Sequence, residues 1–293
     1  MNAQLDSGRD PARNQTIHAS TLKVPGARIH YEARGSGPLL LMIPGGPTDA
    51  GVFADISRHL ADRYTVVAYD PRGNSRSTFD GEPTEQRLDV HADDAARLIE
   101  ALGDGPAYVF GSSGGAQIGL ELAARYPERV RALVAHEPSC LMMLPDPSEP
   151  LAADQDVHDT YRREGIDAAT RKFMALAGLS DEPVGEGAPA GAGLSPEDIE
   201  TFARIGGNME YFFAHGLMPL SLYRPDVARL RGGRPPVVVG VGEESAGRTI
   251  DQIAVALAEK LGTRPVTFPG DHGGYGPHAE RFAECLHGAL GNP

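Results

Sequence analysis

The sequence predicts an α/β fold built around a mostly parallel sheet. Short, wholly apolar runs of strand length recur along the chain, as at residues 39–43 and 236–241, and such runs are typical of strands that are covered on both faces. Segments of helical length and pattern separate most of these runs. Strands that alternate with helices form parallel sheets with right-handed crossovers, so helices should cover both faces of this sheet.

The expected elements keep this alternating order after a short hairpin that turns at Pro25-Gly26. The expected strands are residues 21–24, 29–33, 39–43, 64–69, 107–110, 130–135, 236–241 and 265–268. The expected helices are residues 50–61, 84–102, 116–126, 249–261 and 277–290. Ligands bind beyond the carboxyl ends of the strands in open parallel sheets. Catalytic and binding residues are therefore expected in the loops that follow strands.

The alternation fails between residues 138 and 234. Helical patterns appear there at residues 154–179 and 196–217, and residues 182–193 are loop by their glycine and proline content. We therefore expect a helical cap, residues 138–234, inserted after the sixth strand. An independent domain is the alternative, but nothing in the segment resembles a second sheet.

The remaining parts of the chain complete this domain plan. The α/β core is expected to comprise residues 19–137 and 235–293, and residues 1–18 are expected to form a flexible tail because they are polar and carry no strand or helix pattern. At 293 residues the chain is long for one domain and short for two.

Charge and composition exclude several classes of function. The net charge of −13 argues against nucleic acid and anionic membrane surfaces as partners. There is no apolar run of transmembrane length and no signal-peptide core, so a cytoplasmic protein is expected. Cys140 and Cys285 are then expected to be reduced thiols. No cluster of cysteine and histidine has metal-ligand spacing, so neither a metal nor a cofactor is expected; a homodimer stays open.

The segment that organises the chain is Gly111-Ser112-Ser113-Gly114-Gly115. It follows an apolar strand and precedes a helical pattern, which is the context in which a G-x-S-x-G match indicates a nucleophile. The central Ser113 would sit in a strained turn that excludes side chains at the flanking glycines. A plain turn or a phosphate-binding loop is the alternative, but the P-loop lysine is missing. Ser112 would be the nucleophile only if the register slipped by one residue.

A serine hydroxyl needs a base, and His272 is the best candidate. It lies in a glycine-flanked loop after the last strand and before the last helix. The chain order of serine, acid and histidine also fits this arrangement. His278 is the nearest competitor, although it falls inside the expected closing helix.

Two positions compete for the acid that would orient His272. Glu137 ends the strand after the nucleophile helix, and Glu244 lies in the loop after residues 236–241, where an acid is more usual. That loop carries Ser245 at the position of the usual aspartate, so Glu243 or Glu244 would need a shifted loop. We favour Glu137 and leave Glu244 open.

An oxyanion hole needs two N–H donors. Gly114, which follows the nucleophile, supplies one at the positive end of a helix. The loop Pro44-Gly45-Gly46-Pro47 supplies the other, for which Gly46 is the candidate because Pro47 has no N–H.

Together these motifs resemble the α/β-hydrolase superfamily over nearly the whole chain. A narrower likeness connects Ser112-Ser113-Gly114, residues 126–131 and His136-Glu137 with zearalenone-type lactonases. That resemblance implies a Ser-His-Glu triad, which favours Glu137, and hydrolysis of an ester or lactone. The cap differs, because those lactonases place a cap tryptophan against the ligand and this chain has no tryptophan.

The expected function is a serine hydrolase that cleaves a carboxylic ester or lactone of a small hydrophobic substrate through an acyl-enzyme. A cofactor-free dioxygenase of the same fold is one alternative. A small-molecule binding protein of this fold is another, and the proline-peptidase branch, which shares a Gly-Gly-Pro loop, stays open. Dehalogenases and epoxide hydrolases with an aspartate nucleophile are disfavoured because the turn carries serine.

Overall fold

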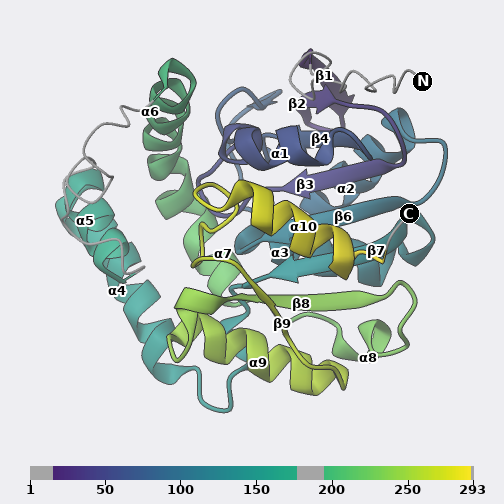
Figure 1. Ribbon diagram of the computed structural model, residues 1–293. Helices are drawn as coiled ribbons and strands as arrows, with labels where there is room; N and C mark the ends of the chain where they lie inside the picture. The colour runs from purple at the N-terminus through teal and green to yellow at the C-terminus, as the bar shows by residue number, and fades with distance from the viewer. Residues whose placement is uncertain (1–15, 177–194, 292–293) are drawn as a thin grey trace, which may run out of the picture.

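The protein is built on one mixed sheet flanked by helices (Figure 1). The structure, a computed structural model, describes residues 16–176 and 195–291. Most of the expected N-terminal tail and the expected loop at residues 182–193 lie outside the described residues. Of the expected tail, His18 already belongs to the first strand.

The sheet is parallel except at its N-terminal edge, which confirms the predicted fold class. Its strand order is β1-β2-β4-β3-β6-β7-β8-β9, and β1 and β2 pair antiparallel to their neighbours. The strands are β1 (His18–Val24), β2 (Ala27–Arg34), β3 (Leu39–Ile43), β4 (Thr65–Tyr69), β6 (Ala107–Ser112), β7 (Val130–His136), β8 (Val237–Gly242) and β9 (Val266–Phe268). The sequence did not predict the two-residue β5 (Thr78–Phe79), which pairs with β2.

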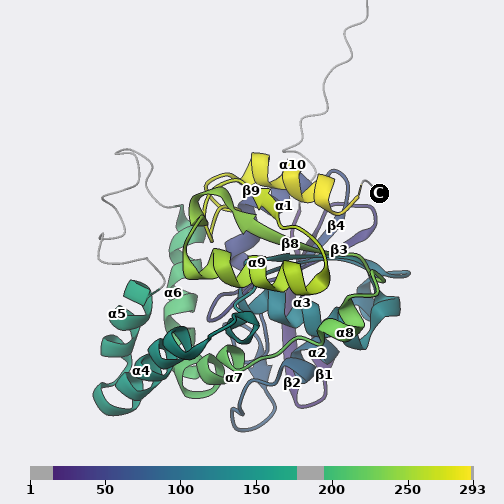
Figure 2. The same cartoon turned by 90° about the horizontal axis from the view of Figure 1, so that it is seen from below.

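Helices cover both faces of the sheet, as the wholly apolar strands require. Helices α1 (Ala54–Leu60) and α10 (Ala279–Ala289) pack on one face of the sheet, and the side chains of Leu40 and Met42 of β3 lie on this face. Leu39, Leu41 and Ile43 of the same strand face the other side. That side is covered by α2 (Leu88–Leu102), α3 (Gly114–Arg125) and α9 (Thr249–Leu261) (Figures 1 and 2).

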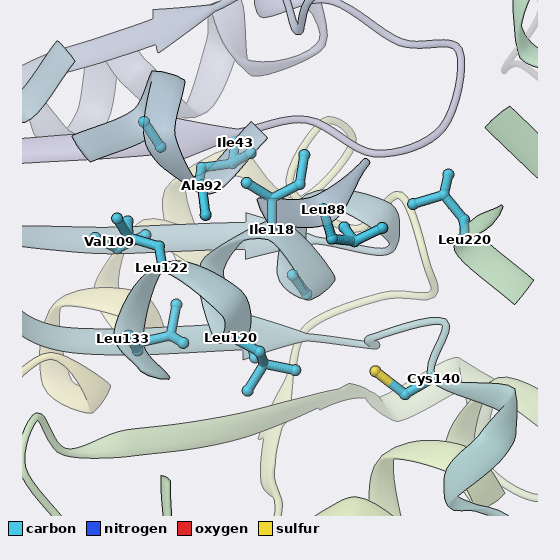
Figure 3. Close-up of a cluster of buried hydrophobic side chains, with 14 of the residues drawn as sticks. Ile43, Leu88, Ala92, Val109, Ile118, Leu120, Leu122, Leu133, Cys140 and Leu220 are labelled. Carbon is cyan, nitrogen blue, oxygen red and sulfur yellow. The ribbon is translucent and has the colours of Figure 1, made fainter. Parts of the chain in front are cut away.

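The second of these faces holds the larger core. Figure 3 shows Ile118 and Leu122 of α3 in the same buried cluster as Val109 of β6 and Leu133 of β7. All four side chains are buried, and each contributes roughly 1.5–3 kcal/mol by leaving water. This packing fixes α3, and with it the turn at Ser113, on the two central strands.

The insertion between β7 and β8, residues 138–234, is helical where the structure describes it. Every regular element among its described residues is helical: α4 (Ser148–Glu164), α5 (Ile166–Leu176), α6 (Pro196–Tyr211), a π-helical turn (Phe212–Gly216), α7 (Leu217–Ser221), α8 (Val227–Leu230) and a short turn at Leu141–Met143. Figure 1 shows α4, α5 and α6 together at one end of the sheet.

The predicted helix at residues 154–179 is wrong in extent, because the chain forms two helices there. Gly165 separates α4 from α5 with φ at 89°, a left-handed conformation that ends a helix and that glycine adopts without strain.

The predicted helix at residues 196–217 is also interrupted, by the π-helical turn. Pro219 has no N–H to give to the carbonyl of His215 four residues earlier. That carbonyl instead accepts a 2.8 Å hydrogen bond from the backbone N–H of Gln86 in the core. The same contact explains why the helix expected from residue 84 begins only at Leu88: Tyr211 Oη also donates to the Thr84 carbonyl at 3.0 Å, so this stretch of backbone binds the insertion.

The two cysteines do not form a disulfide. Cys140 is buried and Cys285 half-buried, and both are free thiols. In residues 16–176 and 195–291 no group of three or more side chains could hold a metal ion. No helix in that part of the chain is long and apolar enough to cross a bilayer.

Candidate functional site

Ser113 occupies a strained turn between β6 and α3. Its backbone has φ 56° and ψ −122°, a conformation that residues with a side chain rarely adopt. A Cβ atom on Gly111 would overlap the Gly115 carbonyl, and one on Gly115 would overlap the Ile43 carbonyl of β3. The two flanking glycines of the motif are therefore required by sterics. The Ser113 N–H donates to the His136 carbonyl at 3.0 Å, which ties the turn to the end of β7.

Replacing Gly115 by alanine is expected to destabilise the protein by about 1–3 kcal/mol, because the new methyl group would overlap backbone atoms of β3 that have no room to move. Urea unfolding followed by circular dichroism measures the change. Gly288→Ala in α10 is the matched control, since a Cβ there has open space and should stabilise the helix by about 0.5–1 kcal/mol. Equal stability of the two variants would contradict the steric argument.

Glu137, which follows β7, and His272, which follows β9, form a hydrogen-bonded pair. His272 Nδ1 lies 2.7 Å from Glu137 Oε2, and the Gly242 N–H at the end of β8 donates to Glu137 Oε1 at 2.8 Å. Glu137 is fully buried and has φ 42°. Burial alone would raise its pKa, but the hydrogen bond and charge of His272, with the Gly242 N–H, lower that pKa to about 2. Glu137 is thus a carboxylate that holds Nδ1 of His272 protonated.

The competing candidates lie elsewhere. Glu244 has a 61% exposed side chain, and its carboxylate is 3.9 Å from His278 Nε2 rather than beside His272. Glu243 lies near the Gly270 N–H and Arg281. Ser112 is buried within β6. The geometry favours Glu137 over Glu244 as the partner of His272.

Ser139 is a site residue that the sequence reasoning missed. Its hydroxyl oxygen lies 2.9 Å from Ser113 Oγ, and this is the hydrogen bond that Ser113 Oγ makes within the described part of the chain. The Ser139 carbonyl is held by Gln117 Nε2 of α3 at 2.8 Å. Ser113 and His272 are not hydrogen-bonded to each other here; catalytic hydrogen bonds are often long in a ligand-free enzyme and tighten on binding. The one available signal was proximity, since Ser139 follows Glu137 by two residues.

The backbone of Gly45 and Gly46 lies directly against the Ser113 turn. A Cβ on Gly45 would be 2.6 Å from Ser113 Cβ and 2.9 Å from the Gly114 nitrogen, and one on Gly114 would be 3.1 Å from the Gly46 nitrogen. Neither the Gly46 nor the Gly114 N–H has a hydrogen-bond partner among the described residues. The two N–H groups are therefore neighbours and are free to bind an anionic oxygen next to Ser113.

Apolar side chains of the insertion border these two glycines. A Cβ on Gly46 would be 3.7 Å from the Phe212 ring, and one on Gly114 would be 3.5 Å from Leu220 Cδ1. Phe212 belongs to the π-helical turn and Leu220 to α7. The surroundings of the candidate oxyanion site are apolar on the side of the insertion.

Comparison with known proteins identifies the family. A family model described as the alpha/beta hydrolase fold matches residues 38–176. A protein of Bacillus subtilis (strain 168), named "Uncharacterized hydrolase YraK", is 38% identical over 282 residues, which cover 94% of this chain and 97% of that protein. The chain belongs to the α/β-hydrolase family.

Solved structures with the α/β-hydrolase fold superpose on nearly the whole chain. A thermophilic esterase from Thermogutta terrifontis matches with a TM-score of 0.70 and 21% identity, covering 94% of this chain and 97% of the esterase. An enol-lactonase from Burkholderia xenovorans LB400 matches with a TM-score of 0.69 and 19% identity, covering 92% and 99%. At these identities the likeness shows the fold.

The turn at residues 70–77, which follows β4, is held in place by buried ion pairs and hydrogen bonds near the site. Asp70 is buried, accepts two hydrogen bonds of 2.8 Å from the Arg76 guanidinium, and accepts the Ala50 N–H at 3.0 Å. Arg72 forms a buried two-bond pair with Asp94 of α2 at 2.7 and 2.9 Å. These contacts fix the turn on the core.

His136, next to Glu137, makes the stability of this hydrolase sensitive to acid. It is fully buried among three phenylalanine rings, and burial lowers its pKa to about 3. Its pKa in the unfolded chain is about 6.5. The folded pKa is the lower one, so protonation of His136 favours the unfolded chain. The contribution of neutral His136 to the free energy of unfolding is therefore complete above pH 6.5 and is lost as the pH falls toward 3.

His136→Leu should therefore lose less stability on acidification than the wild type. Between pH 7.5 and pH 5.5 the wild type is expected to lose about 1.3 kcal/mol more than this variant. Urea unfolding at both pH values measures the difference, and His91, also buried with its pKa lowered to about 4, contributes equally to both proteins. An identical pH dependence in the two proteins would show that His136 is not the neutral group described.

Proposed function

We propose that this α/β-hydrolase cleaves a carboxylic ester or lactone through an acyl-enzyme, with Ser113 as nucleophile, His272 as base and Glu137 as the acid that orients it. The observation that carries the proposal is the hydrogen bond from buried Glu137 to His272, beside the strained Ser113 turn. A carboxylate, an imidazole and a serine in this relation are the components of nucleophilic acyl transfer.

In the proposed reaction, Ser113 Oγ leaves Ser139 and turns to His272 Nε2, which takes its proton as Oγ attacks the substrate carbonyl. Glu137 stabilises the imidazolium that forms. The carbonyl oxygen becomes an oxyanion and accepts hydrogen bonds from the N–H groups of Gly46 and Gly114. His272 then protonates the leaving alcohol and activates water, which releases the acid and restores Ser113. The sequence calls for no cofactor in this cycle.

The substrate class is supported by the apolar border of the site. Phe212 and Leu220 lie where groups attached to the reacting carbonyl would pass, so a hydrophobic acyl or aromatic part should bind there. We propose that residues 138–234 act as a cap that encloses this part. The resemblance to zearalenone-type lactonases agrees with an ester or lactone, as do two of the structural neighbours, an esterase and an enol-lactonase.

The test combines turnover with covalent labelling. Hydrolysis of p-nitrophenyl esters of rising chain length should show an optimum that reports the size of the apolar site. A serine-directed phosphonate should stop turnover and add its mass to the peptide that contains Ser113. If no ester is cleaved and no label is incorporated, the hydrolytic proposal fails. Oxygen uptake would then indicate a cofactor-free dioxygenase, and tight ligand binding would indicate a small-molecule binding protein.

A further inference from the structure

The loop that carries Gly46 is held by its carbonyl groups. The Gly45 carbonyl accepts the Thr48 N–H at 3.0 Å and the Thr48 hydroxyl at 2.6 Å. Asn74 Nδ2 donates to the carbonyls of Gly46 at 3.0 Å and Thr48 at 2.9 Å. The Pro47 carbonyl accepts from Asn208 Nδ2 at 2.7 Å. All four carbonyls from Gly45 to Thr48 are therefore occupied, while the Gly46 N–H is free.

Three of these four carbonyls are bound within the core, and the fourth is bound by the insertion. Asn208 lies on α6, is 5% exposed, and is 161 residues away from Pro47 in the chain. Its Oδ1 accepts the Ser75 N–H at 2.6 Å, and its Nδ2 also donates to Ser75 Oγ at 2.8 Å. The amide thus joins the Gly46 loop to the turn that carries Asn74, which is the other residue holding that loop.

Building on the proposed function, we infer that Asn208 of the insertion helix α6 is a positioning residue for the oxyanion hole. Gly46 has φ 51° and no side chain with which to hold that conformation. Its N–H lies in the Gly45–Gly46 peptide, and the direction of this peptide depends on how the loop through Pro47 is held. An oxyanion donor must lie within about 2.7–3.1 Å of the developing charge, so a small turn of this peptide weakens transition-state binding more than substrate binding.

The rest of α6 is anchored to the core in a way that suits this role. Arg204 Nε pairs with the buried carboxylate of Asp49 at 2.6 Å, and Tyr211 Oη donates to the Thr84 carbonyl. The π-helical turn that follows is fixed through Gln86. Helix α6 is thus held at several points along its length, and Asn208 is the one of these contacts that reaches the loop of Gly46.

The experiment compares Asn208→Ala and Asn208→Asp with Tyr211→Phe. Each removes polar contact between α6 and the core, but only the first two free the Pro47 carbonyl. Aspartate keeps the shape and the acceptor for the Ser75 N–H while losing the donor to Pro47. Both Asn208 variants should lower kcat about tenfold with little change in KM, as expected for a donor that is displaced rather than deleted. Affinity for an alkyl boronic acid, which mimics the tetrahedral intermediate, should fall by the same factor, whereas Tyr211→Phe should match the wild type.

The concentration of active sites is counted by the final extent of phosphonate labelling, so that partial unfolding does not imitate a loss of kcat. Wild-type kcat per labelled site in both Asn208 variants would overturn the inference, as would a rise in KM with unchanged kcat. An equal loss in Tyr211→Phe would also overturn it, because it would show a general effect of loosening α6. If the wild type itself neither turns over esters nor labels at Ser113, the proposed function fails rather than this inference alone.

Discussion

Ser113→Ala is expected to lower kcat/KM for p-nitrophenyl esters by about 10⁴-fold or more while the protein remains folded. The hydroxyl is the group that forms the acyl bond, and alanine removes it without disturbing the backbone, since the Ser113 N–H to His136 hydrogen bond does not involve the side chain. A methyl group fits wherever the serine Cβ already lies. The residual rate would come from substrate binding and from the N–H groups of Gly46 and Gly114.

The control for this variant is Ser112→Ala, which removes a neighbouring hydroxyl that is buried in β6. It should retain activity within a few fold of the wild type. Thermal unfolding of both variants excludes a loss of fold. If Ser112→Ala were the inactive protein, the register of the turn in the functional enzyme would differ from that described. Full activity in both variants would remove a serine nucleophile from the mechanism.

Glu137→Gln is expected to lower kcat by about 10³- to 10⁴-fold with a smaller effect on KM. A neutral amide no longer fixes the Nδ1–H form of His272, so the ring loses both its orientation and the charge that stabilises the imidazolium. The change is nearly isosteric, and the Gly242 N–H keeps an acceptor if the amide oxygen faces it. Steady-state kinetics measures the effect.

Glu244→Gln is the matched control, because it makes the same chemical change in the other candidate acid. With a 61% exposed carboxylate that lies near His278, Glu244 should tolerate the substitution with at most a twofold change in kcat. The reverse result, an inactive Glu244→Gln and an active Glu137→Gln, would show that the loop after β8 rearranges to supply the acid.

The features that the sequence predicted are those encoded by local pattern. Apolar runs identified the strands, and the glycines around Ser113 indicated the turn because sterics demand them there. Some helix boundaries were predicted wrongly because a distant contact decides them. Helix α2 starts late because residues 84–86 bind Tyr211 and His215, and no pattern near residue 84 reveals that.

The site residues also divide into those that a local pattern predicts and those that depend on distant contacts. Ser113, Gly46, Gly114 and His272 could be proposed from motif and order, whereas choosing between Glu137 and Glu244 required knowing which carboxylate faces the imidazole. Ser139 and Asn208 were invisible because a serine or an asparagine is common on any surface. Their roles come from partners 26 and 161 residues away.

The β6–α3–β7 unit affects the order in which parts of the enzyme fold. Residues 107–137 form one βαβ crossover. Its two strands pair in parallel, with Ser112 opposite His136, and its helix packs on both strands. Contacts so close in sequence form early in folding. A chain that has reached Glu137 already contains the candidate nucleophile and acid side by side. The base arrives 135 residues later from the other end of the protein, so hydrolytic activity should be the last property to appear on refolding and the first to vanish when the C-terminal part loosens.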